Sequence, residues 1–186
     1  MDHSAYFHYL RSRSPAGRLY RRFYLYPRLC RHLAGHVLDI GCGLGDMLAF
    51  RSDTVGADIN PYTVAWCRDH GLTARLIRDG QLPFGDAAFD GAILDNVLEH
   101  IADPSDLLAE TRRVLRPRGH LIVGVPGKRG FEADEDHKVF YDETRLRRTL
   151  RRAGFSSTRV FHMPFHFPRL DARIRQYCIY GVFQRL

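Results

Sequence analysis

A glycine-rich turn at residues 41–45 is the first feature of this sequence that could do chemistry. The apolar run Val37-Leu38-Asp39-Ile40 leads into Gly41-Cys42-Gly43-Leu44-Gly45, and a helix-like segment follows. Glycines at this spacing permit backbone conformations that other residues rarely adopt, and they leave no side chain between the main chain and a ligand. We therefore expect a ligand to lie against Asp39, Gly41, Cys42, Gly43 and Gly45.

The residues around this turn argue against two common nucleotide sites. A dinucleotide-binding G-x-G-x-x-G turn would place glycine at position 46, where the chain has Asp46, and a phosphate-binding loop would need a Gly-Lys-Ser/Thr sequence that is absent. Asp39 and Asp46 would also repel a pyrophosphate, which otherwise seeks a helix N-terminus. A positively charged ligand fits this turn better.

Acidic residues follow each of the next three apolar runs. Asp58 ends the second run, Asp79-Gly80 follows the third, and Asp95-Asn96 ends the fourth. Because the carboxyl ends of parallel strands meet at one edge of a sheet, we expect these acids to gather beside the glycine turn. Asp58 could accept both hydroxyl groups of a ribose, and Asp79 could accept from an adenine amine. The pattern predicts a nucleoside site.

The elements that must position these residues alternate along the chain. Five short apolar runs have the character of strands buried on both faces, at 37–40, 54–58, 74–77, 89–94 and 120–125. Helix-like segments lie between them at 44–51, 61–70 and 104–115. This order predicts an α/β fold, a Rossmann-like doubly wound and mostly parallel sheet with helices on both faces.

The ends of the chain frame this core within one predicted domain, residues 1–186. The lead-in at 1–35 is expected to be helical, with one apolar stripe of Leu19, Phe23, Tyr26 and Leu29/Cys30, and with a kink or break at Pro27. Residues 36–125 form the ligand-binding core. Within 126–186, an irregular insert at 126–141 precedes a helix that Asp142 can cap, and 157–163 with 176–183 form a closing β-hairpin pair.

The composition, 45% hydrophobic and 26% charged over 186 residues, fits a packed globular protein. The four cysteines lie far apart without a C-x-x-C pair, so we expect neither a disulfide nor a zinc site. His162 and His166 are four residues apart, but Pro164 interrupts a regular helix and no third ligand has a suitable spacing, so no metal is expected. Without an export signal or an apolar span, we expect a cytoplasmic protein.

Charge is distributed unevenly along the chain, whose formal net charge is +7. Residues 1–35 carry seven arginines and one acid, and residues 142–186 carry ten arginines and three acids. Such basic ends could attract an anionic small molecule, a membrane surface or nucleic acid. Because 26 of the 28 basic residues are arginines, as a genome-wide bias would give, a solvated surface explains them equally well.

From Val37 to about Val125 the chain resembles the class I S-adenosylmethionine-dependent methyltransferases, in particular their small single-domain type 11-like group. The resemblance rests on the turn at 39–45, on Asp58, and on the stretches 79–84, 89–90, 98–101 and 113–119. Arg118 is a minor departure, since many relatives have glycine there. The resemblance implies seven strands with an antiparallel final strand, S-adenosylmethionine as cofactor and S-adenosylhomocysteine as product.

By this resemblance, Asp39 and residues 41–45 would surround the methionyl part of the cofactor. Asp58 would hold the ribose with Ile59 beside it, and Asp79 with Gly80 would bind adenine. Asp95 and Asn96 complete the predicted cofactor-binding residues.

A methyl transfer to a hydroxyl needs a base, and histidine suits neutral pH. His137, in the insert over the expected acceptor mouth, and His100, after the fourth strand, are the predicted catalytic residues. We expect O-methylation of a small molecule, and the arginine-rich ends suit an anionic one. The resemblance to bacterial members of the family implies a sugar or nucleotide-sugar of polysaccharide or lipopolysaccharide assembly as the first acceptor to consider. An RNA methyltransferase, a membrane-associated lipid or quinone methyltransferase and a non-catalytic S-adenosylmethionine-binding protein stay as alternatives. Nucleic acid is not an expected partner, and the sequence fixes no oligomeric state.

Overall fold

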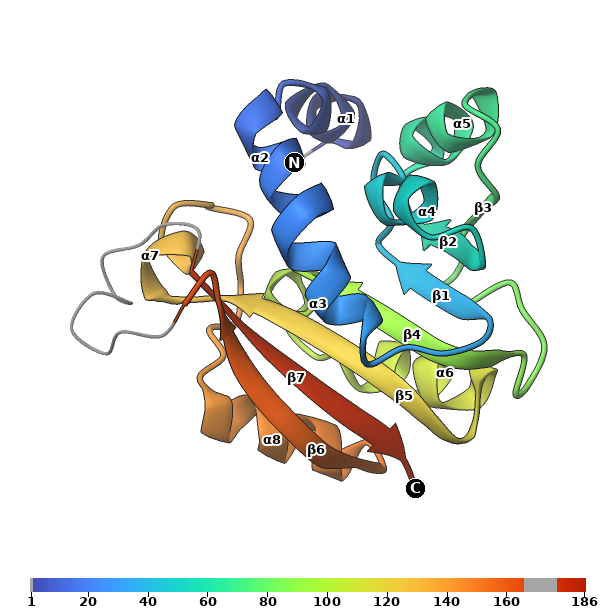
Figure 1. Ribbon diagram of the computed structural model, residues 1–186, viewed down its shortest axis with the longest axis vertical. Coiled ribbons are helices and arrows are strands. Elements are labelled where there is room, and N and C mark those ends of the chain that lie inside the picture. The colour runs from blue at the N-terminus through green and yellow to red at the C-terminus, as the bar shows by residue number, and fades with distance from the viewer. Residues whose placement is uncertain (1, 166–176) are drawn as a thin grey trace.

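A computed structural model describes residues 2–165 and 177–186, which form one seven-stranded sheet in the order β3-β2-β1-β4-β5-β7-β6. The first five strands pair in parallel, and β7 lies antiparallel between β5 and β6 (Figure 1). The strands are β1 (Val37–Ile40), β2 (Thr54–Asp58), β3 (Ala74–Leu76), β4 (Phe89–Asp95), β5 (Leu115–Pro126), β6 (Phe155–Met163) and β7 (Cys178–Arg185). The predicted fold class is confirmed.

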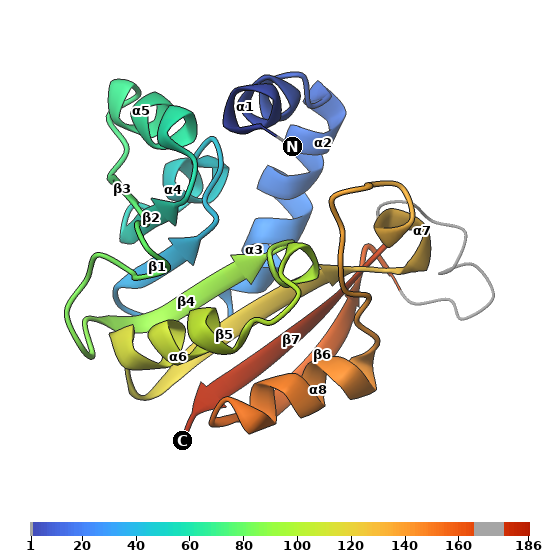
Figure 2. The same cartoon turned by 180° about the vertical axis from the view of Figure 1, so that it is seen from behind.

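Helices cover both faces of this sheet (Figures 1 and 2). One face carries α3 (Tyr26–Cys30), α4 (Asp46–Phe50) and α5 (Pro61–Asp69), and the other carries α6 (Ser105–Val114) and α8 (Glu143–Arg152). Side chains of a strand point alternately to the two faces. Along β5, Leu121 and Val123 therefore join the core with Leu108 of α6, while Ile122 joins the core with Leu29 of α3.

The N-terminal lead-in is helical but buries a different stripe from the predicted one. It consists of α1 (His3–Arg11), α2 (Pro15–Tyr20), the π-helical turn η1 (Arg21–Leu25) and α3. Leu19 is 56% exposed and Phe23 is 70% exposed, whereas Leu25, Tyr26 and Leu29 are buried. A π-helical turn holds more residues than an α-helical turn, so it rotates the buried side away from the regular period. For this reason the predicted stripe was wrong at Leu19 and Phe23, while Tyr26 and Leu29 are buried as predicted; Pro27 lies in the first turn of α3 without breaking the helix.

The connections follow the prediction at most points. The β3–β4 connection, residues 77–88, departs from strict alternation because it contains no helix in the described chain. The insert after β5 holds only the short α7 (Lys128–Phe131), and η2 (Leu98–His100) is a single 3₁₀ turn after β4. Asp142 caps α8 as predicted, since its carboxylate accepts the backbone N–H of Arg145 at 2.7 Å.

Two further expectations were close to the structure. β5 begins at Leu115, five residues before the predicted start, and β6 pairs with β7 as the closing antiparallel pair. Gln176, predicted to open the last strand, lies outside the described residues. Among the helices described, none combines the length and hydrophobicity that crossing a bilayer requires.

Candidate functional site

The glycine turn follows β1 and has a left-handed backbone at its three glycines. The φ angle is +77° at Gly41, +53° at Gly43 and +79° at Gly45. The N–H groups of Gly41 and Cys42 both donate to the carbonyl of Ala57 on β2, which fixes the turn against the neighbouring strand. A Cβ atom at Gly41 would lie 2.7 Å from Cγ2 of Val97. Only glycine fits this position, and the turn presents bare backbone, as its sequence indicated.

Asp39 is buried inside β1, one residue before the strand ends. Burial, followed by the nearby charges of Asp95 and Asp58, raises the pKa of its carboxyl to about 8. The charge of Arg21 acts in the opposite direction, and that of Asp46 adds to the rise. A buried carboxyl among other carboxyls ionises readily only when a cation arrives beside it. The electrostatics of this edge therefore favour a positively charged ligand.

Asp58 ends β2 and ties that strand to the glycine turn. Its Oδ2 accepts the N–H of Gly43 at 2.8 Å, and its Oδ1 accepts the N–H of Asn60 at 2.9 Å. Burial still raises the pKa of Asp58 above its usual value against the effect of these hydrogen bonds. Ile59 beside it is 63% exposed. An acceptor carboxylate thus lies next to an accessible apolar side chain, as a ribose and an adjoining ring would require.

Asp79 and Gly80 form a tight turn after β3. Their φ angles are +52° and +73°, and Arg78 bridges to Gln81 across the turn. Both residues are exposed. Among the described residues, no hydrogen bond connects them to Asp39 or Asp58, so their contact with adenine stays a prediction.

Asp95 is held by three neighbours at the end of β4. Its Oδ2 accepts from Nη1 of Arg21 at 2.9 Å, and its Oδ1 accepts from the hydroxyl of Tyr180 at 2.7 Å and from Nδ2 of Asn96 at 2.9 Å. The first two partners come from η1 and β7, far from Asp95 in sequence. Asp95 and Asn96 were predicted to bind the cofactor. In the structure, Asp95 also attaches the N-terminal helices to the sheet through its ion pair with Arg21. No signal in the sequence pointed to the contacts of Arg21 and Tyr180 with Asp95.

The helix α1 covers the glycine turn and the end of β2. Leu10 is 2% exposed, and its Cδ1 would lie 3.4 Å from a Cβ atom at Gly43. Asn60 donates through Nδ2 to the carbonyl of His3 at 2.8 Å. Burial raises the pKa of Tyr6, which also interacts electrostatically with Asp58 and Asp134. The lead-in is therefore part of the site's wall.

Glu99, His100 and His137 lie together next to this edge, on η2 and on the insert. Nε2 of His137 lies 4.0 Å from Oε1 of Glu99, and the rings of His100 and His137 meet edge to face with centroids 4.6 Å apart. Burial raises the pKa of Glu99 to about 8. Burial, followed by the charge of His137, lowers the pKa of His100. The structure thus brings both predicted catalytic histidines together and adds Glu99, which the sequence analysis missed although it is an acid within an apolar stretch.

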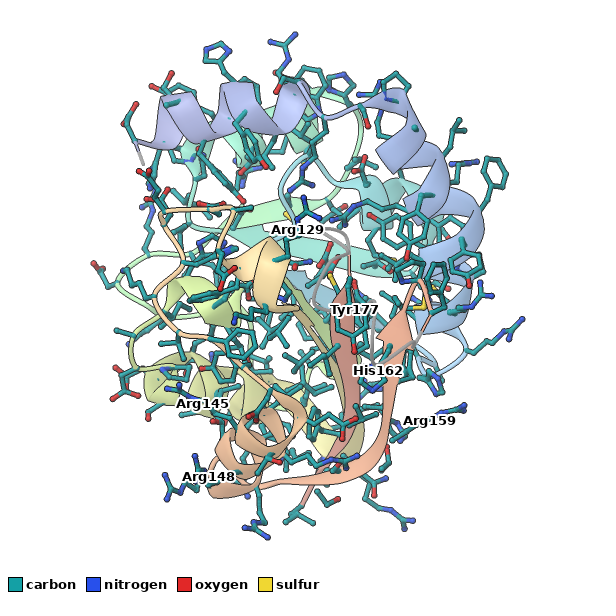
Figure 3. The ribbon with its side chains drawn as sticks, turned by 90° about the vertical axis from the view of Figure 1, so that its left-hand side faces the viewer. Arg129, Arg145, Arg148, Arg159, His162 and Tyr177 are labelled. Atoms are coloured by element: carbon teal, nitrogen blue, oxygen red, sulfur yellow. The ribbon has the colours of Figure 1, made fainter. Side chains whose placement is uncertain are left out.

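The remaining polar features lie elsewhere. His162 has Nε2 3.0 Å from Oε1 of Glu143 and stacks on Tyr177, as Figure 3 shows, so it joins β6 to α8. His166, the other histidine of the spacing considered for a metal, lies outside the described residues. A cavity of about 740 Å³ lies beside the helix-free β3–β4 connection, lined among others by Val55, Arg75 and Arg113. It includes none of the predicted cofactor-binding or catalytic residues.

With this geometry in view, residues 38–123 match a family described as a methyltransferase domain. A protein of Mycolicibacterium smegmatis named a probable S-adenosylmethionine-dependent methyltransferase is 33% identical over 80% of this chain and 64% of its own length. The O-methyltransferase resE of Aspergillus sclerotiorum is 33% identical over 52% of this chain and 41% of its own length. The chain therefore spans less than two thirds of these curated relatives.

Solved structures share the fold. An S-adenosylmethionine-dependent methyltransferase from Mesorhizobium loti superposes with a TM-score of 0.69 at 17% identity, covering 86% of this chain and 96% of that one. The [4+2]-cyclase SpnF superposes with a TM-score of 0.65 at 19% identity, covering 87% and 79%. Because a protein described as a cyclase shares the architecture, the reaction must be argued from the site.

Proposed function

Because this chain belongs to the class I S-adenosylmethionine-dependent methyltransferases, we propose that it transfers a methyl group to a hydroxyl of a small-molecule acceptor. Membership implies S-adenosylmethionine as cofactor and S-adenosylhomocysteine as product. When bound, S-adenosylmethionine supplies a methyl group on a positively charged sulfur, which is open to attack by a nucleophile. The observation that carries the proposal is the buried carboxyl of Asp39 beside a turn of bare backbone.

The residues at the cofactor edge fit this cation. Asp39 would take its charged form when the ammonium and sulfonium groups neutralise the field of Asp58 and Asp95. The bare backbone of Gly41 and Gly43 would let the methionyl chain lie against the main chain. The buried side chain of Leu10, on α1 next to Gly43, would exclude water from this part of the site. Holding donor and acceptor in line can contribute about 7–11 kcal/mol to lowering the barrier.

His137 and His100 are the proposed acceptor-side residues. Nδ1 of His137 lies 2.8 Å from the carbonyl of Phe131, and a carbonyl can only accept, so Nδ1 donates this hydrogen bond and Nε2 is the ring nitrogen left to face the site. A ring nitrogen of this histidine pair would assist the loss of the acceptor's proton. The name of the fungal relative, an O-methyltransferase, agrees with a hydroxyl acceptor.

For the acceptor we propose a sugar or nucleotide-sugar as the class to test first. The basic chain ends, with exposed Arg145 and Arg148 on α8, would attract an anionic molecule. The four cysteines are free in the described structure, which fits the reducing cytoplasm proposed as the place of action.

The direct test is an acceptor screen that detects S-adenosylhomocysteine. We expect turnover with at least one hydroxyl compound among sugars, nucleotide-sugars and simple phenols, and loss of turnover when that hydroxyl is replaced by hydrogen. His137→Ala and His100→Ala should lower kcat by about 10²- to 10⁴-fold while leaving the affinity for S-adenosylmethionine unchanged.

The matched control is His70→Ala, at an exposed histidine on the far end of α5. Undiminished kcat in both histidine variants would remove them from the mechanism. Tight binding of S-adenosylmethionine without turnover on any acceptor would support the non-catalytic alternative.

A further inference from the structure

The carboxyl group of Glu99 is fully buried, and both of its oxygens lack a hydrogen-bond partner in the part of the chain that the structure describes. A buried polar group without a hydrogen bond destabilises the folded state, and native structures contain few such groups. An unpaired buried carboxyl group therefore indicates that a ligand is missing. The oxygens are directed at the histidine pair, since Oε1 is the atom that faces Nε2 of His137.

His137 is arranged as metal-ligating histidines are. Its Nδ1–H donates to the carbonyl of Phe131 at 2.8 Å, which fixes the tautomer, and its ring stacks on Phe131 with centroids 5.3 Å apart, which fixes the orientation. A hydrogen bond from the remote ring nitrogen to a backbone carbonyl is the usual partner of a histidine bound to metal. The other ring nitrogen, Nε2, lies between Glu99 and Asp134, at 4.0 and 3.9 Å from their nearest oxygens.

The backbone holds these groups opposite each other. The carbonyl of Glu99 accepts the N–H groups of Lys138 at 2.7 Å and Val139 at 3.0 Å. These hydrogen bonds hold the insert against η2 at the residue next to His137. His100 follows Glu99 directly, and its ring donates a hydrogen bond to the backbone carbonyl of Asp136. The ligand atoms of Glu99, His100 and His137 consequently lie within 4.8 Å of one another.

A simple ion pair does not account for this arrangement. An imidazolium and a carboxylate in contact approach to about 2.7–2.9 Å, whereas Nε2 of His137 and Oε1 of Glu99 stay 4.0 Å apart although both are buried. An ion between them would satisfy both groups. From this geometry we propose that Glu99, His100 and His137 bind a divalent transition-metal ion of the zinc type.

The ligand set and its dimensions fit such an ion. Two imidazoles and one carboxylate are the protein ligands of one class of catalytic zinc site, in which a fourth position stays open. Ligands at about 2.1 Å in tetrahedral geometry lie about 3.4 Å apart, so the three side chains must draw together by about 1 Å. Asp134 adds negative charge at 3.9 Å from Nε2 of His137. If the proposed O-methylation holds, the open position would take the acceptor oxygen, and this use alone rests on the proposed function.

The test measures metal on the untagged chain of residues 1–186 without donor or acceptor. After chelator treatment and dialysis, titration with Zn²⁺ followed by calorimetry and elemental analysis should give one tightly bound ion per chain. Co²⁺ in its place should give visible absorption bands of an ion bound to imidazole. Glu99→Gln and His137→Gln, each first shown to be folded by circular dichroism, should weaken zinc binding by about 100-fold or more, since even indirect partners contribute 10- to 100-fold.

The control is His70→Gln, which should bind zinc as the wild type does because His70 is exposed and outside the cluster. If Glu99→Gln does not fold, the double variant His100→Gln/His137→Gln takes its place. Zinc binding by the wild type that equals that of the folded variants would show surface binding only and overturn the proposal, as would the absence of binding. These outcomes are independent of whether any acceptor is methylated, so failure of the metal site and failure of the proposed function can be told apart.

Discussion

Asp39 is buried beside Asp58 and Asp95, and this burial raises its pKa to about 8. Below about pH 8 the carboxyl of Asp39 therefore keeps its proton in the free protein, and a cationic ligand beside it would favour the charged form. The same residue type at the exposed end of α5, Asp69, experiences no such environment. Two predictions at the scale of the residue follow from this contrast.

Asp39→Asn should weaken the binding of S-adenosylmethionine while preserving the fold. The amide keeps the shape of the carboxyl but cannot carry the charge, and a hydrogen bond to a charged group contributes about 1.5–3 kcal/mol, or roughly 10- to 150-fold in Kd. Isothermal titration calorimetry at about pH 8 measures this change. Asp69→Asn is the control and should bind as the wild type does; equal Kd values for the two variants would remove Asp39 from the site.

The affinity for S-adenosylmethionine should rise with pH. Since the pKa of Asp39 is about 8 in the free protein and a bound cation lowers it, binding below that pH must release a proton. The Kd should fall by up to about tenfold per pH unit between about pH 6 and about pH 8 and then level off. Calorimetry in two buffers of different ionisation enthalpy counts the released proton. In Asp39→Asn the slope and the proton should both disappear, and their persistence would assign them to another group.

At the scale of the element, the π-helical turn η1 decides how the N-terminal helices sit on the sheet. Its first residue, Arg21, reaches Asp95 at the end of β4, where Tyr180 of β7 also donates. The side chains of Arg21 and Asp95 are 24% and 12% exposed. One largely buried carboxylate thus joins η1, β4 and β7 at the edge where the cofactor is proposed to bind.

Arg21→Met should lower the free energy of unfolding by about 3 kcal/mol, because removing one partner of a largely buried pair leaves the other charge uncompensated. Urea denaturation followed by circular dichroism measures this loss. Arg22→Met, at the exposed neighbouring residue, is the control and should stay within about 0.5 kcal/mol of the wild type. The double variant Arg21→Met/Asp95→Asn should regain part of the loss; a double variant less stable than the single one would contradict the role of the pair.

At the scale of the whole molecule, buried apolar clusters lie on both faces of one sheet. Ile122 of β5 packs with Leu29 of α3 on one face, and Leu121 packs with Leu108 of α6 on the other. Because the N-terminal helices and the last strands contact the same central strands, we expect residues 1–186 to unfold as one unit, in keeping with the single predicted domain.

One cooperative transition should therefore appear, and S-adenosylmethionine should shift it upward. At about 100 times its Kd, a ligand that binds only the folded state adds about 2.7 kcal/mol, or roughly 5–10 °C in Tm for a chain of this size. Thermal denaturation followed by circular dichroism and by fluorescence tests both points. A dinucleotide at the same concentration should give no shift, and two separate transitions would disprove a single domain.

The sheet and its glycine turn could be predicted from the sequence because both produce patterns within a few consecutive residues. Buried parallel strands are short and apolar throughout, and the turn after β1 needs glycine at Gly41 whatever surrounds it. The first half of the apolar stripe in the lead-in was misassigned because a π-helical turn has no local signal and is selected by packing, whereas Tyr26 and Leu29, after that turn, are buried as predicted. For the same reason Leu25 is buried where Phe23 was expected.

By itself, the sequence determined the α/β class, the order of most elements and the run of acids at the carboxyl edge, because hydrophobic period and turn chemistry are local properties of the chain. Only the tertiary structure decided which side chains meet there. Arg21 and Tyr180 reach Asp95 across 74 and 85 residues, and His137 faces Glu99 from the other side of β5. Such contacts depend on how the strands and the insert pack against one another in three dimensions. The spacing of residues along the chain does not predict which distant residues come into contact.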